Sequence, residues 1–135
     1  MYKEVKYIAT IPEKDKKIAY LLCKDKKILI PMELRDDSCF IYPKLKNTCE
    51  SILYALKARI ILSKIYKYQN GIFYTYIRIK RGYGYIDINT SPLTALGVSR
   101  LFGVPLLISE DIVKDKGFYI TKKMIEDAFN KDLPV

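Results

Sequence analysis

The sequence contains no histidine and no tryptophan, and only one glutamine among its 135 residues. Without histidine, any acid or base chemistry has to use Asp, Glu, Lys, Tyr or Cys side chains. The three cysteines, Cys23, Cys39 and Cys49, are odd in number and lack the close spacing of a metal or redox motif. We therefore expect a reduced, cytoplasmic protein. The abundance of Lys, Ile and Tyr beside these absences is typical of thermophilic proteins.

The sequence also lacks a long uninterrupted apolar run. Its longest weakly charged stretch, residues 88–109, is interrupted by Pro92, Arg100 and Pro105, which argues against a membrane span. The first six residues alternate charged and apolar side chains, so they do not resemble the apolar core of a secretory signal. We expect no membrane partner.

Acidic residues are missing from one long window, residues 51–86, which holds seven Lys or Arg and eight Tyr or Phe residues. The net charge of the whole chain, +9, also favours a polyanionic partner. Basic groups attract phosphates and aromatic rings stack on bases, so DNA or RNA is one expected partner. A tyrosine-rich sheet face is equally suited to being covered by the second subunit of a homodimer. The window alone leaves both interpretations open.

Hydrophobic periodicity predicts a single α+β domain over residues 1–135 with a largely antiparallel sheet. Three short strands are expected at residues 5–9, 18–22 and 28–30, followed by a turn at Asp36-Asp37. A central helix is expected to begin at Pro43. Its apolar residues recur at three- and four-residue spacings, so we expect this face to pack on the sheet: Leu45, Cys49, Ile52, Leu53 and Leu56.

The acid-free window predicts a β-meander. Asn70-Gly71 between two strand-like runs is a strong hairpin signal, because both central residues of a type I′ turn need positive φ. A second two-residue turn at Arg81-Gly82 would pair Lys80 with Tyr83, Arg78 with Tyr85, Tyr76 with Asp87 and Tyr74 with Asn89. Alternation then separates an aliphatic face from a face of tyrosines and cations. The residues expected to bind nucleic acid are Lys67, Tyr74, Tyr76, Arg78, Lys80, Arg81, Tyr83 and Tyr85.

The helices and the strand expected after residue 90 are predicted from residues typical of helix starts and helix ends. Ser91-Pro92 is typical of a helix start, and Gly103 of the position just after a helix. A short apolar strand at residues 104–108 leads to a second helix start, where Ser109 precedes Glu110-Asp111. A last helix is expected at residues 122–131, within a C-terminal extension that spans residues 116–135.

Residues 91–106, with the segment 108–112 that follows, resemble the bifunctional nuclease domain family. That family reads Asp-Ala-Arg-Pro-Ser-Asp, then an Ala/Leu-rich helix, Gly-x-Pro, an apolar strand and Ser-Glu-Glu; this chain reads Ser-Pro-Leu-Thr, an Ala/Leu-rich helix, Gly-Val-Pro, an apolar strand and Ser-Glu-Asp. The likeness in the order of elements extends over residues 5–115. It implies a compact, self-associating α+β domain and the DNase and RNase activity reported for some members.

The polar part of the family motif differs in this chain. Asn89, Ser91, Leu93 and Thr94 stand where the family has Asp, Arg, Ser and Asp, and Pro92 alone is retained. Two explanations are open. Either the family's polar residues serve the fold, or this chain has lost the activity that they support.

Hydrolysis of phosphodiesters normally needs carboxylates that hold a divalent metal, Mg²⁺ or Mn²⁺, or act as acid and base. The catalytic candidates in this sequence are Asp87, Glu110 and Asp111. Each also has an ordinary structural role available, because Asp87 can pair with Arg78 and the other two lie at a helix start. The sequence thus predicts either a metal-dependent, nonspecific nuclease or a non-catalytic nucleic-acid-binding or assembly module, and the loss of charged motif residues favours the module.

Overall fold

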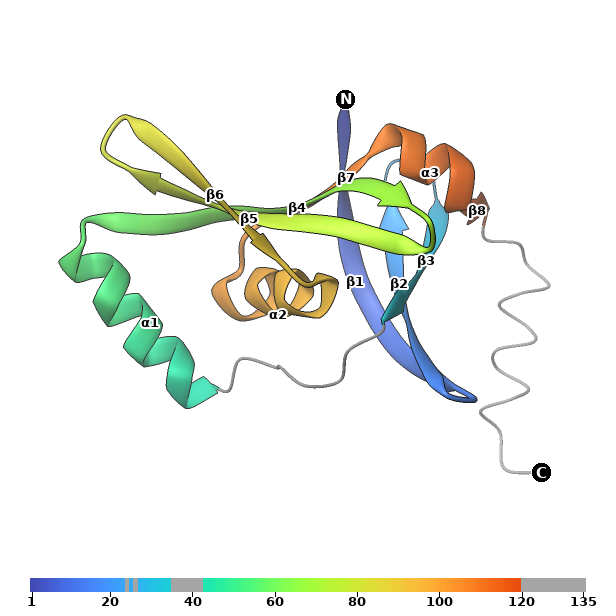
Figure 1. Cartoon of the computed structure of the whole chain (residues 1–135), viewed down its shortest axis with the longest axis horizontal. Helices are drawn as coiled ribbons and strands as arrows, with labels where there is room; N and C mark the ends of the chain where they lie inside the picture. Colours follow the sequence, from blue (N-terminus) through green and yellow to red (C-terminus); the bar gives the residue numbers. More distant parts are fainter. Residues whose placement is uncertain (24, 26, 35–42, 120–135) are drawn as a thin grey trace.

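The N-terminal part of the chain forms an antiparallel meander of three strands. A computed structural model of the chain describes residues 1–23, 25, 27–34 and 43–119, and it places β1 at Tyr2–Glu13, β2 at Lys16–Cys23 and β3 at Ile28–Leu34 (Figure 1). The three predicted strands are confirmed, although each is longer than expected. β3 continues through Pro31, which pairs with Tyr20. Proline is tolerated there because the next strand, β8 (Phe118–Tyr119), pairs only with Ile28 and Leu29. The predicted turn at Asp36-Asp37 lies outside the described residues.

All the described strands belong to one sheet, in the order β6-β5-β4-β7-β1-β2-β3-β8. Its second half contains β4 (Ala58–Gln69), β5 (Ile72–Arg81), β6 (Gly84–Thr90) and β7 (Leu106–Ser109). Neighbouring strands pair antiparallel except β4 and β7, which are parallel. The predicted α+β class with a largely antiparallel sheet is confirmed.

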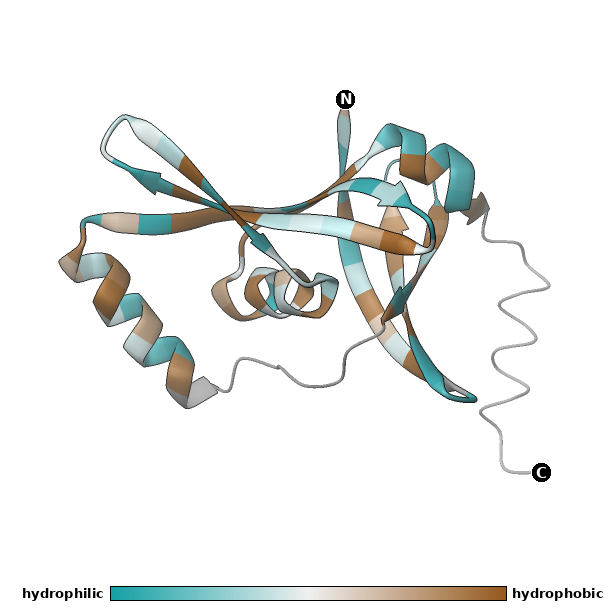
Figure 2. Ribbon diagram, in the orientation of Figure 1, coloured by the Kyte–Doolittle hydropathy of each residue, from teal (hydrophilic) through white to brown (hydrophobic). Residues whose placement is uncertain are grey.

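Helix α2 (Pro92–Phe102) covers one side of β4 and β5 (Figure 1). Its ends were predicted correctly. The Ser91 hydroxyl accepts a hydrogen bond from the backbone N–H of Thr94, and Gly103 ends the helix in the left-handed region with φ 65°. A buried hydrogen bond from the Ser63 hydroxyl to the carbonyl of Ala95, 2.9 Å long, ties the helix to β4. Hydrophobic and hydrophilic residues alternate along several strands in Figure 2, as expected for a sheet with one buried face.

The hydrophobic core is continuous from α2 across the sheet to α3 (Glu110–Lys116). Ser109 caps α3 as predicted, by accepting a hydrogen bond from the backbone N–H of Asp111. The largest completely buried aliphatic and sulfur-containing side chains in this core are Leu21, Cys23, Ile30, Met32, Ile65 and Ile108. Among the described helices none is long and apolar enough to cross a membrane. The helix expected at residues 122–131 lies outside the described part of the chain.

Helix α1 (Pro43–Ala55) begins where predicted, but its apolar face is not buried on the sheet. Leu45, Ile52 and Leu56 are 49%, 53% and 50% exposed, and only Cys49 and Leu53 of the predicted face are partly buried. The expectation of a helix packed centrally on the sheet is therefore wrong. The helix lies beside α2 and the start of β4, at the edge of the part of the sheet that α2 covers (Figure 1). These neighbours are too few to bury its whole apolar face.

The two hairpins of the meander differ in how well they were predicted. Asn70 and Gly71 have φ of 54° and 78°, as the type I′ turn between β4 and β5 requires. The second loop is Gly82-Tyr83 rather than Arg81-Gly82, because Arg81 pairs with Gly84 inside the ladder. Gly82 supplies the positive φ, 60°, at the first central position, a conformation that arginine adopts poorly. The predicted register is thus wrong by two residues, which leaves every side chain on its predicted face.

A glycine after α3 provides a stability test of the packing between this helix and β3. A Cβ at Gly117 would overlap the carbonyl oxygen of Val113 and the Cγ2 of Ile28, whereas a Cβ at Gly97 in α2 would meet open space. We expect Gly117→Ala to lower the free energy of unfolding by about 1–3 kcal/mol through overpacking. The matched control Gly97→Ala should raise it by about 0.5–1 kcal/mol because alanine favours the helix. Urea unfolding followed by circular dichroism measures both, and a Gly117→Ala chain as stable as the unmodified protein would contradict this packing.

Candidate nucleic-acid interface

The side of β4, β5 and β6 opposite to α2 carries most of the predicted binding residues. In β5 the buried side chains Phe73, Thr75 and Ile77 alternate with Tyr74, Tyr76 and Arg78. In β6, Tyr85 lies opposite Lys80, Asp87 opposite Arg78, and Asn89 opposite Tyr76. We call this surface the tyrosine face and define it by the outward residues Lys64, Tyr66, Lys67, Tyr74, Tyr76, Arg78, Tyr85 and Asp87. The structure therefore brings together the predicted tyrosines and Arg78.

Arg78 organises the centre of the tyrosine face. Its Nε lies 2.8 Å from Oδ1 of Asp87 and its Nη2 lies 3.1 Å from Oδ2, a bidentate pair. Its guanidinium also lies 5.5 Å from the ring centroids of both Tyr76 and Tyr85. The hydrogen bonds from Arg78 lower the pKa of Asp87, and those to Asp87 raise the pKa of Arg78. The ion pair therefore persists at neutral pH and is lost only as the pH falls through the lowered pKa of Asp87.

Lys64 is a member of the tyrosine face that the sequence did not reveal. Its side chain is nearly buried, since the residue is 9% exposed, and its Nζ lies 4.0 Å from the ring centroid of Tyr2 and 5.5 Å from that of Tyr76. Two irregularities in β4, at residues 61 and 66, shift the alternation, so a strict period of two misplaces its side chains. Tyr2 lies near Lys64 because β1 pairs with β7, and β7 pairs with β4. This contact joins distant segments of the chain, so no local sequence pattern predicts it.

The tyrosine rings form a connected layer that still leaves ring surface open. Tyr66 lies 6.3 Å from Tyr74 and 5.4 Å from Tyr76 between ring centroids, in tilted arrangements. Lys67 lies over Tyr74 at 5.4 Å, and this lysine is itself exposed. Tyr74 and Tyr85 remain 37% and 58% exposed. These two rings are the ones best placed to stack on a base from solution.

Cations gather at the end of the tyrosine face near the β5–β6 turn. Lys57, Arg59 and Lys80 line one open hollow together with Tyr54 of α1. Arg81 is exposed beside them, and Tyr83 projects from the turn with no part of its side chain covered. The predicted residues Lys80, Arg81 and Tyr83 thus continue the face as a basic tip, to which Lys57 and Arg59 add charge that was not predicted.

The three predicted catalytic carboxylates are not assembled into one site. Asp87 is engaged by Arg78, as described above. Glu110 lies 3.7 Å from Nζ of Lys3, which also pairs with Asp25 at 3.2 Å, and Asp111 is exposed in the first turn of α3. Nowhere among the described residues do three or more Cys, Asp or Glu side chains cluster in a way that could hold a metal ion. Asp87, Glu110 and Asp111 therefore do not together provide a donor set for Mg²⁺ or Mn²⁺.

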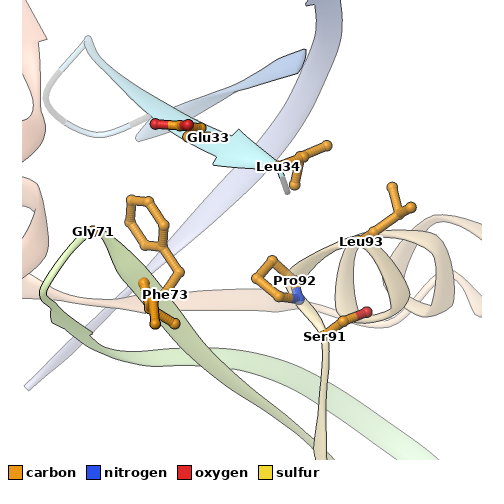
Figure 3. Close-up of a pocket in the computed structure, with 8 residues that line it drawn as sticks. Glu33, Leu34, Gly71, Phe73, Ser91, Pro92 and Leu93 are labelled. Carbon is orange, nitrogen blue, oxygen red and sulfur yellow. The ribbon is translucent and has the colours of Figure 1, made fainter. Parts of the chain in front are cut away.

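The motif positions serve the start of α2. The hydroxyls of Ser91 and Thr94 lie 2.9 Å apart, Pro92 is the first residue of the helix, and Asn89 is an exposed residue of β6. Beside them lies an apolar pocket of about 200 Å³, where Pro92 faces Phe73 across the opening and Leu34 lies above (Figure 3). Ser91, Pro92 and Thr94 thus stabilise the start of α2.

Comparison with known proteins adds no identification. A scan against protein-family models finds no match to this chain, and a search of curated proteins finds no significant match.

Proposed function

We propose that the protein binds single-stranded nucleic acid without sequence specificity, through the tyrosine face and its basic tip. The observation that carries this proposal is the pairing of exposed rings with cations on one open sheet surface: Tyr74 and Tyr85 offer ring surface, and Lys67 lies beside Tyr74. Base–aromatic stacking tolerates any base because every base has a π-face. Single strands expose those faces, whereas a duplex keeps them stacked.

The charge of the surface supports the same partner. Asp87 is the only carboxylate in β4, β5 and β6, and Arg78 neutralises it. Lys67 at one end of the face and Lys80 with Arg81 at the other are placed to contact phosphates along a strand. A nucleic-acid strand that runs along β5 would therefore meet positively charged side chains at both ends of the row of tyrosine rings and beside it.

Hydrolysis remains a prediction from the family resemblance. Glu110 and Asp111 lie at the start of α3 rather than on the tyrosine face, and Asp87 has its carboxylate oxygens occupied by Arg78. Binding therefore has more support from the geometry than cleavage does. Hydrolysis would need the Asp87 carboxylate, whereas binding of phosphates is opposed by its negative charge. Removal of this charge therefore tests which function is correct.

We expect Asp87→Asn to strengthen binding of a fluorescent oligo(dT) by about two- to fivefold, because the change removes a negative charge and frees Arg78 for phosphate. Fluorescence anisotropy at low salt measures the affinity. The matched control Asp115→Asn makes the same change of net charge at an exposed residue of α3, and it should alter the affinity less. Mg²⁺- or Mn²⁺-dependent cleavage of the oligonucleotide that Asp87→Asn abolishes would contradict the binding proposal in favour of hydrolysis. Weaker binding after Asp87→Asn would also contradict it.

A further inference from the structure

Among the described strands, β6 is an edge strand whose outer side is unpaired. It lies at one end of the sheet and pairs with β5. Every residue from 84 to 89 is exposed, and the two isoleucines on its aliphatic side, Ile86 and Ile88, are 49% and 45% exposed. Edge strands are usually protected by lysine, proline, a bulge or a covering element. The strand Gly84–Thr90 contains neither lysine nor proline, and its one charged side chain is already paired with Arg78.

The backbone groups of β6 that face the open edge follow from the turn. In a hairpin with a two-residue loop, the closing pair, here Arg81 and Gly84, exchanges backbone hydrogen bonds. Alternate residues from Gly84 onward, Ile86 and Ile88, then bond to β5. The N–H and C=O groups of Tyr85, Asp87 and Asn89 therefore point away from the sheet, where a further strand would meet them.

We propose that β6 pairs antiparallel with β6 of a second copy of this chain, about a two-fold axis at Ile88. This register places Asp87 opposite the partner's Asn89, so an amide faces a carboxylate and like charges are kept apart. Ile88 then faces the partner's Ile88 at a position where side chains of antiparallel strands approach closely. A two-fold contact of this kind uses the same surface on both copies and closes as a dimer.

The proposed contact leaves the tyrosine face uncovered. Residues that lie directly opposite each other in an antiparallel ladder point to the same side of the sheet, and this register pairs Asp87 with the partner's Asn89. Both tyrosine faces would therefore lie on one side of the dimer. This arrangement differs from a dimer in which the tyrosines themselves form the subunit interface. It does not depend on nucleic-acid binding and is tested separately from it.

Sedimentation velocity of the full chain over a concentration series tests the proposal. Proline at Asn89 removes an N–H that faces the open edge and leaves the β5–β6 ladder intact, so Asn89→Pro should raise the dimer dissociation constant at least about tenfold. Ile88→Lys should also raise the dissociation constant by about tenfold, because two like charges would face each other on the two-fold axis. The matched control Ile8→Lys makes the same change at a 49% exposed isoleucine of β1, away from β6, and should change nothing.

Hydrogen exchange on the same samples locates the contact. The amides of Tyr85, Asp87 and Asn89 should become more protected as the concentration rises, and those of Tyr85 and Asp87 should not do so in the Asn89→Pro chain. Circular dichroism confirms that each variant is folded. The proposal is overturned by a chain that stays monomeric across the series, by a dimer that both β6 variants leave intact, or by a dimer that Tyr74→Ala dissociates and Asn89→Pro does not.

Discussion

Replacing Tyr74 and Tyr85 together by alanine is expected to weaken oligo(dT) binding by about 30-fold or more. Stacking on one aromatic ring contributes roughly 1–3 kcal/mol per base, and two bases would lose their platforms. The two rings lie beside different cations, Tyr74 beside Lys67 and Tyr85 beside Arg78, so their contributions should be largely independent. Fluorescence anisotropy with a labelled oligonucleotide at low salt measures the affinities of the single and double variants.

Two exposed tyrosines outside the tyrosine face provide matched controls for this experiment. Tyr54 is 87% exposed on α1 and Tyr119 is 68% exposed on β8. Tyr119→Ala should leave the affinity unchanged, and Tyr54→Ala should have a small effect because Tyr54 borders the basic tip. An equal loss for Tyr119→Ala, or no loss for the double variant Tyr74→Ala/Tyr85→Ala, would show that bases do not stack on this face.

Salt is expected to weaken the same binding by about 20-fold between 50 and 200 mM. If Lys67, Lys80 and Arg81 each neutralise one phosphate, the slope of log affinity against log salt for a single strand is about −2, because each contact contributes about −0.7. Anisotropy titrations at four salt concentrations give the slope. Lys67→Ala should make the slope shallower by about 0.7, since one phosphate contact is removed.

A flat salt response would favour the other interpretation of this surface. Tyrosines on a sheet are also suited to a subunit interface, where their hydroxyls meet water and polar groups. In that case self-association would be insensitive to salt, Tyr74→Ala would dissociate the oligomer, and the oligonucleotide would not bind. Titrations of the same samples therefore separate the two interpretations of the tyrosine face.

The elements predicted best from the sequence have local signals at their ends. Asn70-Gly71 identifies its hairpin because few other dipeptides accept two positive φ angles. Ser91 and Gly103 identify the two ends of α2 because one provides a side-chain acceptor and the other a left-handed residue. Alternation placed Tyr74, Tyr76 and the rest of the β5 face correctly, since a register error of two residues does not exchange the faces of a strand.

The features that sequence reasoning missed depend on contacts between distant segments. The irregularities of β4 move Lys64 toward Tyr2, and neither residue's neighbours in the sequence indicate that contact. The apolar spacing of α1 is correct for a helix that packs, yet spacing does not show how much partner surface is present; Ile52 and Leu56 remain half exposed. Similarly, the separation of Asp87 from Glu110 follows from the strand order, which the sequence did not determine.

The most direct measurement of the central claim is an NMR titration of the chain, with labelled tyrosine rings, against a short oligo(dT). Ring signals report contact with a base residue by residue, without altering the surface. Binding to the tyrosine face predicts saturable shifts for Tyr74 and Tyr85, smaller shifts for the partly buried Tyr66 and Tyr76, and none for Tyr119. Saturable binding that leaves Tyr74 and Tyr85 unshifted, or no binding at low salt, would contradict the account.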